Sequence, residues 1–183
     1  MFSKISVYSI IKDHISTLKS NRTEKVYIPD IFLFFVLPAF CSYALVFFEV
    51  LLKDSLANAL TTSFSIFSAL LFNLLLLVYD ISEKDSNLSN KNLPDLVAQK
   101  RQNSRRKLLQ EVYINVSFSI LIATVAVVLL LFYFLLDTIG NSSIVCTFTK
   151  VVAFGVYYLA IQFLLTLFMV LKRIYRLLSK AFE

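Results

Sequence analysis

Four apolar stretches alternate with polar segments along this chain of 183 residues. At a rise of about 1.5 Å per residue, some twenty helical residues cover the roughly 30 Å of a membrane's hydrocarbon core. The expected spans are Ile31–Leu52, Leu60–Tyr79, the upper half of a helix over Pro94–Leu136, and Val151–Leu171. The pattern predicts an all-α integral membrane protein with four transmembrane helices arranged as two hairpins.

The first hairpin combines a proline bend with small-residue packing. Pro38 is expected to bend the first span, because its ring removes a backbone donor and clashes one turn back. Between Lys53 and Ala59 there is room only for a tight turn. The face of the first span that carries Pro38, Ser42, Leu45 and Glu49 is assigned to the bundle interior. On the second span a stripe of small and polar residues is expected to face other helices instead of lipid, because small residues allow close packing and an Asn in hydrocarbon needs a partner. That stripe is Thr61, Ser65, Ala69 and Asn73.

The polar middle of the chain, Asp80 to Asn115, divides the two hairpins. Its Ser-, Asn- and Asp-rich first part, Asp80 to Asn92, predicts a flexible loop. Pro94 fits the first turn of a helix, and no breaker follows before Leu136. The third span is therefore expected to extend below the membrane, with a small-residue stripe in its upper half. That stripe is Ser119, Ala123 and Ala126.

The fourth span has the most polar face of any span. The connection before it, Asp137 to Lys150, is expected to turn at Gly140-Asn141. After Leu171, basic and apolar residues interleave, which predicts that the helix continues as an amphipathic tail. The polar face consists of Gly155, Tyr158, Gln162, Thr166 and Met169.

Charge sets the expected orientation. Sixteen of the 18 Lys and Arg residues lie before the first span, in the polar middle or after the fourth span. Basic residues collect on the cytoplasmic face of membrane proteins, so both termini and the middle are expected in the cytoplasm. The resulting segments are 1–30 (amphipathic N-terminus), 31–79 (hairpin one), 80–115 (charged loop and helix), 116–171 (hairpin two) and 172–183 (basic tail).

The N-terminal segment carries an apolar stripe at helical spacing. Val7, Ile11, Ile15 and Leu18 share one face, which predicts a short helix on the membrane surface, or one packed against the loop or a partner. His14, the single histidine, lies beside the stripe and is interpreted as a surface or packing residue.

Glu49 is the only acidic residue within a predicted span. Such a charge suggests a proton or cation site. However, Glu49 lies near the outer end of its span and Lys53 follows four residues later, so a carboxylate paired with Lys53 is the simpler interpretation. Other intramembrane polar residues predict either interhelical hydrogen bonds or a polar path: Ser42, Asn73, Tyr158, Gln162 and Thr166.

The densest charge cluster lies in the polar middle. Near a membrane it should attract anionic lipid, and it could also dock an acidic cytoplasmic protein. Direct nucleic-acid binding is not expected, because no aromatic residues interleave with the cluster. Predicted partner or lipid contacts are Lys100, Arg101, Arg105, Arg106 and Lys107, with Arg173 and Arg176 in the tail.

Nothing in the sequence predicts an enzyme, a cofactor or a metal site. The chain has one His and two Cys, and it contains neither a phosphate-binding glycine loop nor a nucleophile with a base nearby. Cys41 is expected within a span and Cys146 in the outer connection, so no disulfide is expected between them.

The short basic N-terminus, the four spans with both ends cytoplasmic and the charged middle over Asp80 to Glu111 resemble small membrane subunits of bacterial anti-phage systems, such as that of the Kiwa system. The resemblance implies a homo-oligomeric membrane component that senses infection and works with a soluble DNA-binding partner. We therefore expect a non-enzymatic membrane sensor or scaffold that recruits a cytoplasmic protein. The alternatives are a holin-like pore former and a small proton-coupled exporter that uses Glu49.

Overall fold

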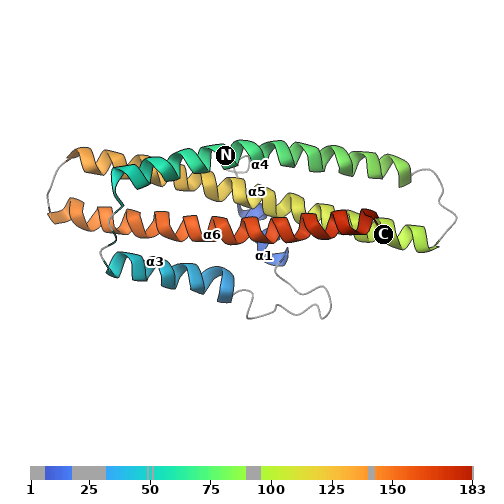
Figure 1. The fold of residues 1–183 in the computed structure, drawn as a ribbon, viewed down its shortest axis with the longest axis horizontal. Coiled ribbons are helices and arrows are strands. Elements are labelled where there is room, and N and C mark those ends of the chain that lie inside the picture. The colour runs from blue at the N-terminus through green and yellow to red at the C-terminus, as the bar shows by residue number, and fades with distance from the viewer. Residues whose placement is uncertain are drawn as a thin grey trace.

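The computed structural model describes residues 7–17, 32–48, 50, 52–89, 96–139 and 143–182. Helices make up almost all of these ranges and no strand occurs within them, which confirms the all-α fold class. Three long helices lie along the molecule: α4 (Asp54–Ser89), α5 (Leu96–Ile139) and α6 (Ser143–Phe182). Figure 1 shows α5 between α4 and α6.

Two shorter helices complete the described structure. The α-helix α3 (Leu37–Phe47) follows a π-helical turn, η2 (Phe32–Val36), and both lie against α6. Near the middle of the long helices, α1 (Tyr8–Thr17) packs on α5. Thus α5 and α6 form the frame on which the other helices are placed.

The length of α5 follows from its sequence. Its 44 residues, about 66 Å at helical rise, contain no Gly or Pro, and Gly140 follows directly after the last helical residue. The predicted single helix that combines the third span with a cytoplasmic extension is therefore confirmed as a helix. It begins at Leu96 and ends at Ile139 instead of the predicted Pro94 and Leu136.

A strict heptad seam explains how α5 packs. Buried positions alternate at spacings of three and four residues along most of the helix, which is the 3.5-residue repeat of left-handed helix packing. Ser119, Ala123 and Ala126 are fully buried in this seam, as predicted, and let the neighbouring backbones approach. The whole seam is Leu109, Val112, Val116, Ser119, Ala123, Ala126, Leu130 and Tyr133.

The face by which α4 meets α5 is not the small-residue stripe predicted from the sequence. Ala57, Phe64, Leu71 and Val78, spaced seven residues apart, are buried toward the bundle. The predicted stripe lies on the outward side of α4: Thr61 is half-buried, and Ser65, Ala69 and Asn73 are exposed, so its contact with other helices stays a prediction. The reason is steric, because Phe64 and Phe67 pack edge-on against the Phe163 ring of α6 and direct this side of α4 inward.

On α6 the predicted polar face does turn inward. Gln162 and Thr166 are buried, and Gly155, Tyr158 and Met169 are half-buried. A Cβ atom at Gly155 would lie 3.3 Å from Leu129 Cδ1, so the glycine permits a close approach of α6 to α5. The small residue thus sets how near the two longest helices pack.

The first predicted hairpin does not form as a packed pair. Within the described ranges, α3 lies against α6 and α4 lies against α5, and α3 makes no backbone approach to α4. Two tyrosines explain the separation, because Tyr133 donates to Leu52 O and Tyr157 donates to Val50 O at 3.1 Å. These hydroxyls hold the link between α3 and α4 over the end of the α5–α6 pair.

Within α3, Pro38 and Ser42 are buried, as predicted for that face, and Leu45 is half-buried. Pro38 lies in the first turn of α3, where no intrahelical donor is required, and the π-helical turn before it takes up the change in geometry. Glu49, the fourth residue predicted for this face, lies outside the described residues.

Two connections are more helical than predicted. The expected loop over Asp80–Asn92 is wrong as far as Ser89, because α4 continues to that residue, and no Gly or Pro interrupts it. The expected connection over Asp137–Lys150 is helical except for residues 140–142, which lie outside the described ranges. Cys146 consequently belongs to α6 instead of a loop, while Cys41 in α3 is a free cysteine. The predicted helical continuation of the tail is confirmed to Phe182.

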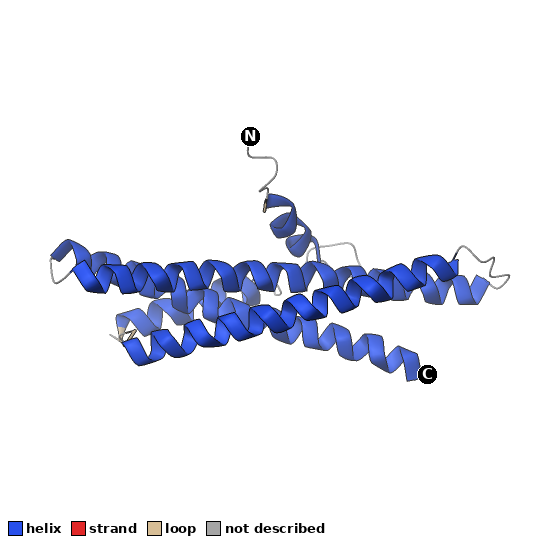
Figure 2. Cartoon of the chain, turned by 90° about the horizontal axis from the view of Figure 1, so that it is seen from above, coloured by secondary structure: helices blue, strands red, loops and turns tan. Residues whose placement is uncertain are grey.

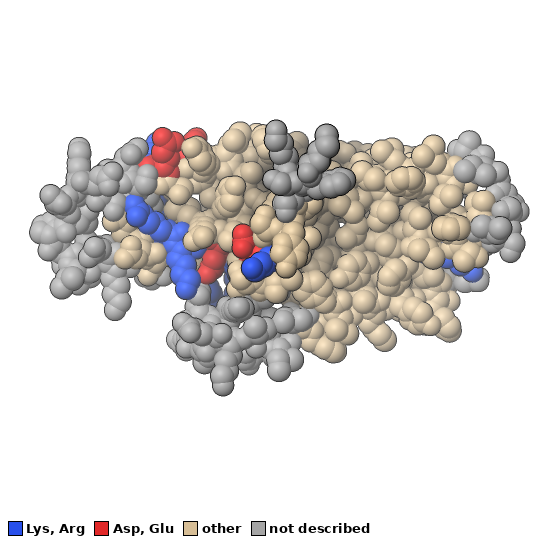
Figure 3. All heavy atoms as spheres, turned by 180° about the vertical axis from the view of Figure 1, so that it is seen from behind, with Lys and Arg blue, Asp and Glu red and all other residues tan. Residues whose placement is uncertain are grey.

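Three of the described helices are long and apolar enough to cross a membrane: Asp54–Lys84, Gln102–Leu136 and Thr147–Ser179. The apolar helix Phe34–Phe47 is shorter than these three, although its sequence predicts a full span. Charged side chains gather over one half of the long helices, and the other half is apolar until its far end (Figure 3). This segregation indicates a membrane protein whose long helices extend beyond the hydrocarbon on one side.

Candidate functional site: a polar node that joins α1, α5 and α6

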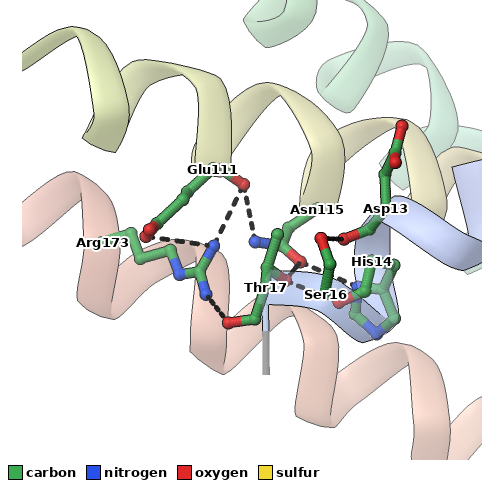
Figure 4. Close-up of polar contacts among 7 residues, drawn as sticks. All are labelled: Asp13, His14, Ser16, Thr17, Glu111, Asn115 and Arg173. Carbon is green, nitrogen blue, oxygen red and sulfur yellow. Dashed lines mark hydrogen bonds and ion pairs between the residues drawn. The ribbon is translucent and has the colours of Figure 1, made fainter. Parts of the chain in front are cut away.

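The most polar buried contact in the described structure lies where the apolar halves of α5 and α6 end. Asn115 on α5 and Arg173 on α6 are the residues at which the packed helix surfaces become polar, and α1 brings His14 and Thr17 to the same place. Glu111, one turn before Asn115, completes the group (Figure 4). We call these five residues, His14, Thr17, Glu111, Asn115 and Arg173, the polar node.

Helical periodicity places Arg173 in the node. Leu159, Thr166 and Arg173 are seven residues apart on α6, and Thr166 is fully buried. The guanidinium therefore continues a packed seam instead of pointing to solvent, and only 11% of its side chain is exposed. Its NH1 lies 3.5 Å from Glu111 Oε2, so the buried cation has a carboxylate partner.

Asn115 is the centre of the hydrogen bonds. Its Nδ2 donates to Glu111 O at 2.6 Å, and its Oδ1 accepts from Thr17 Oγ1 at 3.1 Å. His14 Nδ1 lies 2.8 Å from the same Oδ1. Because the amide nitrogen is already used as a donor, Nδ1 must carry the proton in this contact, and Nε2 carries the lone pair.

His14 is held among aromatic rings. It is fully buried, stacks on Phe118 with ring centroids 3.7 Å apart, and meets Phe34 edge-on at 6.5 Å. Its Nε2 is buried without a hydrogen-bond partner. A proton added to Nε2 would thus place a second donor and a positive charge in an apolar contact.

The electrostatics of the node favour neutral His14. Burial lowers the pKa of His14 from 6.5 to about 4; the hydrogen bond with Asn115 acts in the opposite direction, and the positive charge of Arg173 lowers the pKa further. Packing of α1 on the bundle therefore favours the neutral imidazole, and protonation of His14 favours detachment of α1.

Arg173 also closes the end of α1. Its NH2 donates to the backbone oxygen of Thr17, the last residue of α1, at 2.9 Å. The last carbonyls of a helix lack intrahelical donors and carry the negative end of the helix dipole, so a guanidinium at this position stabilises the helix. A ten-residue helix is marginal by itself in water, and this contact ties the formation of α1 to its attachment to the bundle.

The contact face of α1 differs from its apolar stripe. Ile10, His14 and Thr17 face α5, whereas Ile11 and Ile15 remain 41% and 40% exposed. The sequence predicted a helix on the membrane surface or one packed against the loop or a partner. The structure shows α1 packed on α5, and the placement of its exposed stripe on a membrane stays a prediction. Figure 2 shows α1 projecting sideways from the bundle, so its exposed stripe can lie along a membrane surface. Leu18, the last residue of the predicted stripe, lies outside the described residues.

No family model, curated protein or solved structure matches this chain. Function is accordingly argued from the geometry of the node and from the surfaces around it.

The predicted basic contacts divide into two groups. Arg105, Lys107 and Arg176 are exposed, Arg106 is half-buried, and Arg173 belongs to the polar node. Lys100 and Arg101 lie on the same α5 extension, but their side chains are outside the described set. The exposed members therefore form part of a basic surface, whereas Arg173 has a structural role that its membership of the basic tail did not suggest.

The predicted intramembrane polar residues also differ from one another. Ser42 donates to Pro38 O at 2.7 Å and Thr166 donates to Gln162 O, so both hydroxyls are satisfied within their own helices. Tyr158 is half-buried and Asn73 is exposed. The predicted pairing of Glu49 with Lys53 lies outside the described residues.

Gln162 is the exception among these residues. Its side chain is 2% exposed, and neither Oε1 nor Nε2 has a hydrogen-bond partner. Two contacts fix the register of the antiparallel helices α5 and α6: Glu111 with Arg173, and Leu129 with Gly155. Both helices advance by the same number of residues between these contacts, so Gln162 lies level with Ile122 of α5. The amide therefore lies inside the apolar half of the bundle, where an unpaired polar group is expensive.

Sequence reasoning missed Glu111, Thr17 and Asn115, and it did not identify the contacts of His14. One signal was present: Glu111 is the last charge before the apolar run of α5, and Arg173 is one of the two adjacent basic residues that follow the apolar run of α6. The contacts of the node are not local in sequence, because His14 and Asn115 are 101 positions apart and Thr17 and Arg173 are 156 positions apart. Among the described residues, no group of His, Cys, Asp and Glu could hold a metal ion.

Proposed function

We propose that this protein is a membrane sensor or scaffold that recruits a soluble cytoplasmic protein, and that it acts without catalysis. In this proposal α3 with η2 supplies the fourth span, both termini lie in the cytoplasm of a bacterial inner membrane, and the protein is a homo-oligomer. The layout resemblance to the membrane subunit of the Kiwa anti-phage system favours a role in phage defence with a DNA-binding partner.

One observation carries the proposal. The polar node joins the N-terminal helix, the extension of α5 and the tail of α6, which are the three segments expected on the cytoplasmic side. A change at the membrane surface that moves α1 would break hydrogen bonds on α5 and α6 together. These contacts give a physical route from the membrane to the helical extensions where a partner could bind.

The proposed fourth span is supported by where the two ends of the α3 segment lie along the long helices. Phe34, at the start of the α3 segment, lies beside His14 at the node, whereas Val50 and Leu52 are held by tyrosines at the other end. From Asn115 to Tyr133, α5 rises by about 27 Å, close to the hydrocarbon thickness. The segment from Phe34 to Leu52 thus covers the same depth as the long helices.

The partner surface is proposed on the basic extension of α5. Arg105 and Lys107 are exposed, and Arg176 on α6 is exposed beyond the node. Exposed basic residues attract acidic surfaces and anionic headgroups alike, and screening by salt weakens both. A protein partner is favoured because the described helix α5 continues about 22 Å below Glu111, to Leu96, which is well beyond a headgroup layer of about 5–8 Å. Lys107 and Arg105 lie about 6 and 9 Å below Glu111, at the membrane-proximal end of this extension.

The test is charge reversal on this surface. The variant Arg105→Glu with Lys107→Glu should lose co-purification of the soluble protein encoded beside this chain, while membrane insertion is unchanged. The matched control is Lys53→Glu with Lys150→Glu, which reverses two exposed charges at the opposite end. Equal recovery of the partner with both variants would refute the proposed surface.

A pore or polar path is the second candidate, and Gln162 is the observation that favours it. Its unpaired amide and the buried hydroxyls of Ser42, Ser119 and Thr166 lie among α3, α5 and α6. Expression should then depolarise cells, as reported by a potential-sensitive dye, and Gln162→Leu should abolish the effect. Export through Glu49 remains a third proposal, tested by Glu49→Gln.

A further inference from the structure

We infer that the outward face of α4 is the surface by which two copies of this chain associate, with Asn73 of one copy hydrogen-bonded to Asn73 of the other. The inference rests on the proposed homo-oligomer and on α4 crossing the membrane, and it names the surface and the contact that the oligomer uses.

The first observation is the unequal coverage of the three membrane-crossing helices. In the most apolar window of α4, 17% of the residues are buried, against 33% in those of α5 and α6. Among the described elements, only α5 runs close to the α4 backbone. Large apolar side chains such as Ile66, Leu70 and Leu76 remain 55%, 58% and 51% exposed. Lipid alone could cover such a surface, so exposure by itself does not identify the occupant.

Asn73 is the residue that favours a protein contact over lipid on this face. It lies on the exposed face, and no hydrogen bond to its amide occurs in the described structure. Seven residues separate it from Asp80, so it lies about 10 Å inside the apolar stretch. Hydrocarbon offers no partner for an amide, and polar side chains in spans therefore face other helices.

The neighbouring hydroxyls do not need a partner. Thr62 Oγ1 donates to Asn58 O at 2.9 Å, and Ser65 Oγ donates to Thr61 O at 2.8 Å. Both groups are satisfied within α4, so Asn73 is the polar group of this face that requires an external donor and acceptor. This difference makes Thr62 and Ser65 natural controls.

The spacing on this face indicates a second helix. Many residues of α4 are exposed, and five of them on the side opposite the buried seam recur at steps of four and three, which is the spacing of a heptad seam. Small Thr62 and Ala69 alternate with larger residues, so a second backbone can approach at Ala69. The outward seam is Thr62, Ile66, Ala69, Asn73 and Leu76.

A second copy of the chain is the occupant that this face fits, because its polar residue can pair with itself. All copies of the chain share one orientation, so two α4 helices pair in parallel and each seam residue meets its own equivalent. Asn carries both a donor and an acceptor, and two equivalent Asn73 side chains can satisfy each other. The next seam position is Asp80, whose charge would repel its equivalent, so the closest approach lies near Ala69 and Asn73.

Cysteine cross-linking in the membrane tests this surface. In full-length protein with Cys41→Ser and Cys146→Ser, single cysteines at Ile66, Ala69, Asn73 and Leu76 should form dimers on oxidation. Cysteines that replace Phe67 and Leu74, on the flank of α4 toward the bundle, should form far less cross-linked dimer. Equal cross-linking at all positions, cross-linking only at the flank, or none at any position would overturn the inference.

A second measurement tests Asn73 directly. Asn73→Leu should weaken dimerisation in detergent or bilayers about fivefold to tenfold, and Asn73→Gln should largely restore it, as expected for an interhelical hydrogen bond. The controls Thr62→Val and Ser65→Ala should change dimerisation by less than twofold. An unchanged dimer in Asn73→Leu, or a cysteine at position 73 that cross-links only to a different protein, would contradict a contact between two copies.

Partner recruitment is measured in the same samples. If wild-type protein shows no α4 cross-link but still inserts and binds its partner, the inferred α4 contact is refuted and the proposed function holds. Loss of partner binding together with the dimer would indicate that recruitment requires two copies, and dimerisation without any partner binding would refute the proposed function alone.

Discussion

Two parts of the same helix make opposite kinds of contact. From Val116 to Leu130, α5 packs through a dry seam of small and branched residues, and from Glu111 to Asn115 it packs through buried hydrogen bonds and an ion pair. In a membrane, the apolar seam gains from close packing with little competition from water. The polar node depends on every donor finding its acceptor, so it can be broken by a single proton or by loss of one partner.

The comparison teaches where this molecule can switch. The seam holds α4, α5 and α6 together whatever the state of α1, because most of its residues are apolar and its hydroxyls, those of Ser119 and Tyr133, donate to backbone oxygens and not to α1. The node holds α1 only in one protonation state and with one arrangement of Arg173. A sensor built this way keeps its membrane core fixed while a surface helix attaches or detaches.

The largest effect is expected from Arg173→Ala. It removes the guanidinium that lies against the half-buried Glu111 carboxylate and the donor to Thr17 O, and breaking such a pair costs about 3–5 kcal/mol. We expect α1 to detach while α4, α5 and α6 remain packed. Spin labels that replace Lys12 and Tyr175, both exposed, would report the detachment as a broad distance distribution.

The neighbouring Lys172→Ala is the matched control, because Lys172 is exposed and lies outside the node. It should leave the distance distribution narrow. A narrow distribution in Arg173→Ala as well would show that the node does not hold α1.

The next effect is the pH dependence of α1. His14 has a pKa of about 4 when α1 is attached and near its ordinary value of 6.5 when α1 is free. Attachment is therefore strongest above pH 6.5, weakens about tenfold for each pH unit between 6.5 and 4, and changes no further below that. The same pair of spin labels measures it. His14→Phe, which keeps the ring stack, should remove the dependence, and a pH profile identical to that of the unchanged protein would exclude His14 as its source.

The smallest effect is expected in the apolar half, from Gly155→Ala. The added methyl group would lie 3.3 Å from Leu129 Cδ1, the end of a flexible side chain that can move aside, while alanine favours the helix by about 1 kcal/mol. We expect the midpoint of unfolding in denaturing detergent to change little. A large fall of the unfolding midpoint in Gly155→Ala would mean that the seam is less tolerant than its packing indicates.

Prediction from sequence succeeded where periodicity and breakers decide the structure. The absence of Gly and Pro over residues 96–139 predicted the long α5, and Ser119, Ala123 and Ala126 predicted its close packing. It did not identify the face of α4 that meets α5, because small residues at Ser65 and Ala69 and large ones at Phe64 and Leu71 lie on opposite faces of a largely apolar helix. Only the partner helix decides which face is buried.

The node could not be predicted for a different reason. The apolar stripe of α1 suggested which face would pack, but His14 and Thr17 on another face found Asn115 and Arg173. Polar contacts between distant segments leave no periodic signal within either one. The same holds for the tyrosines that bind backbone oxygens of the α3–α4 link.

The most direct test of the node is a double-mutant cycle between His14 and Asn115, measured as the free energy of α1 attachment from the spin-label populations. The variants are His14→Phe, Asn115→Leu and the pair together. A buried hydrogen bond of 2.8 Å predicts that the sum of the two single losses of attachment free energy exceeds the loss in the double variant by about 1 kcal/mol or more. Single effects that simply add would show that these residues do not act together and would contradict the attachment of α1 through the node.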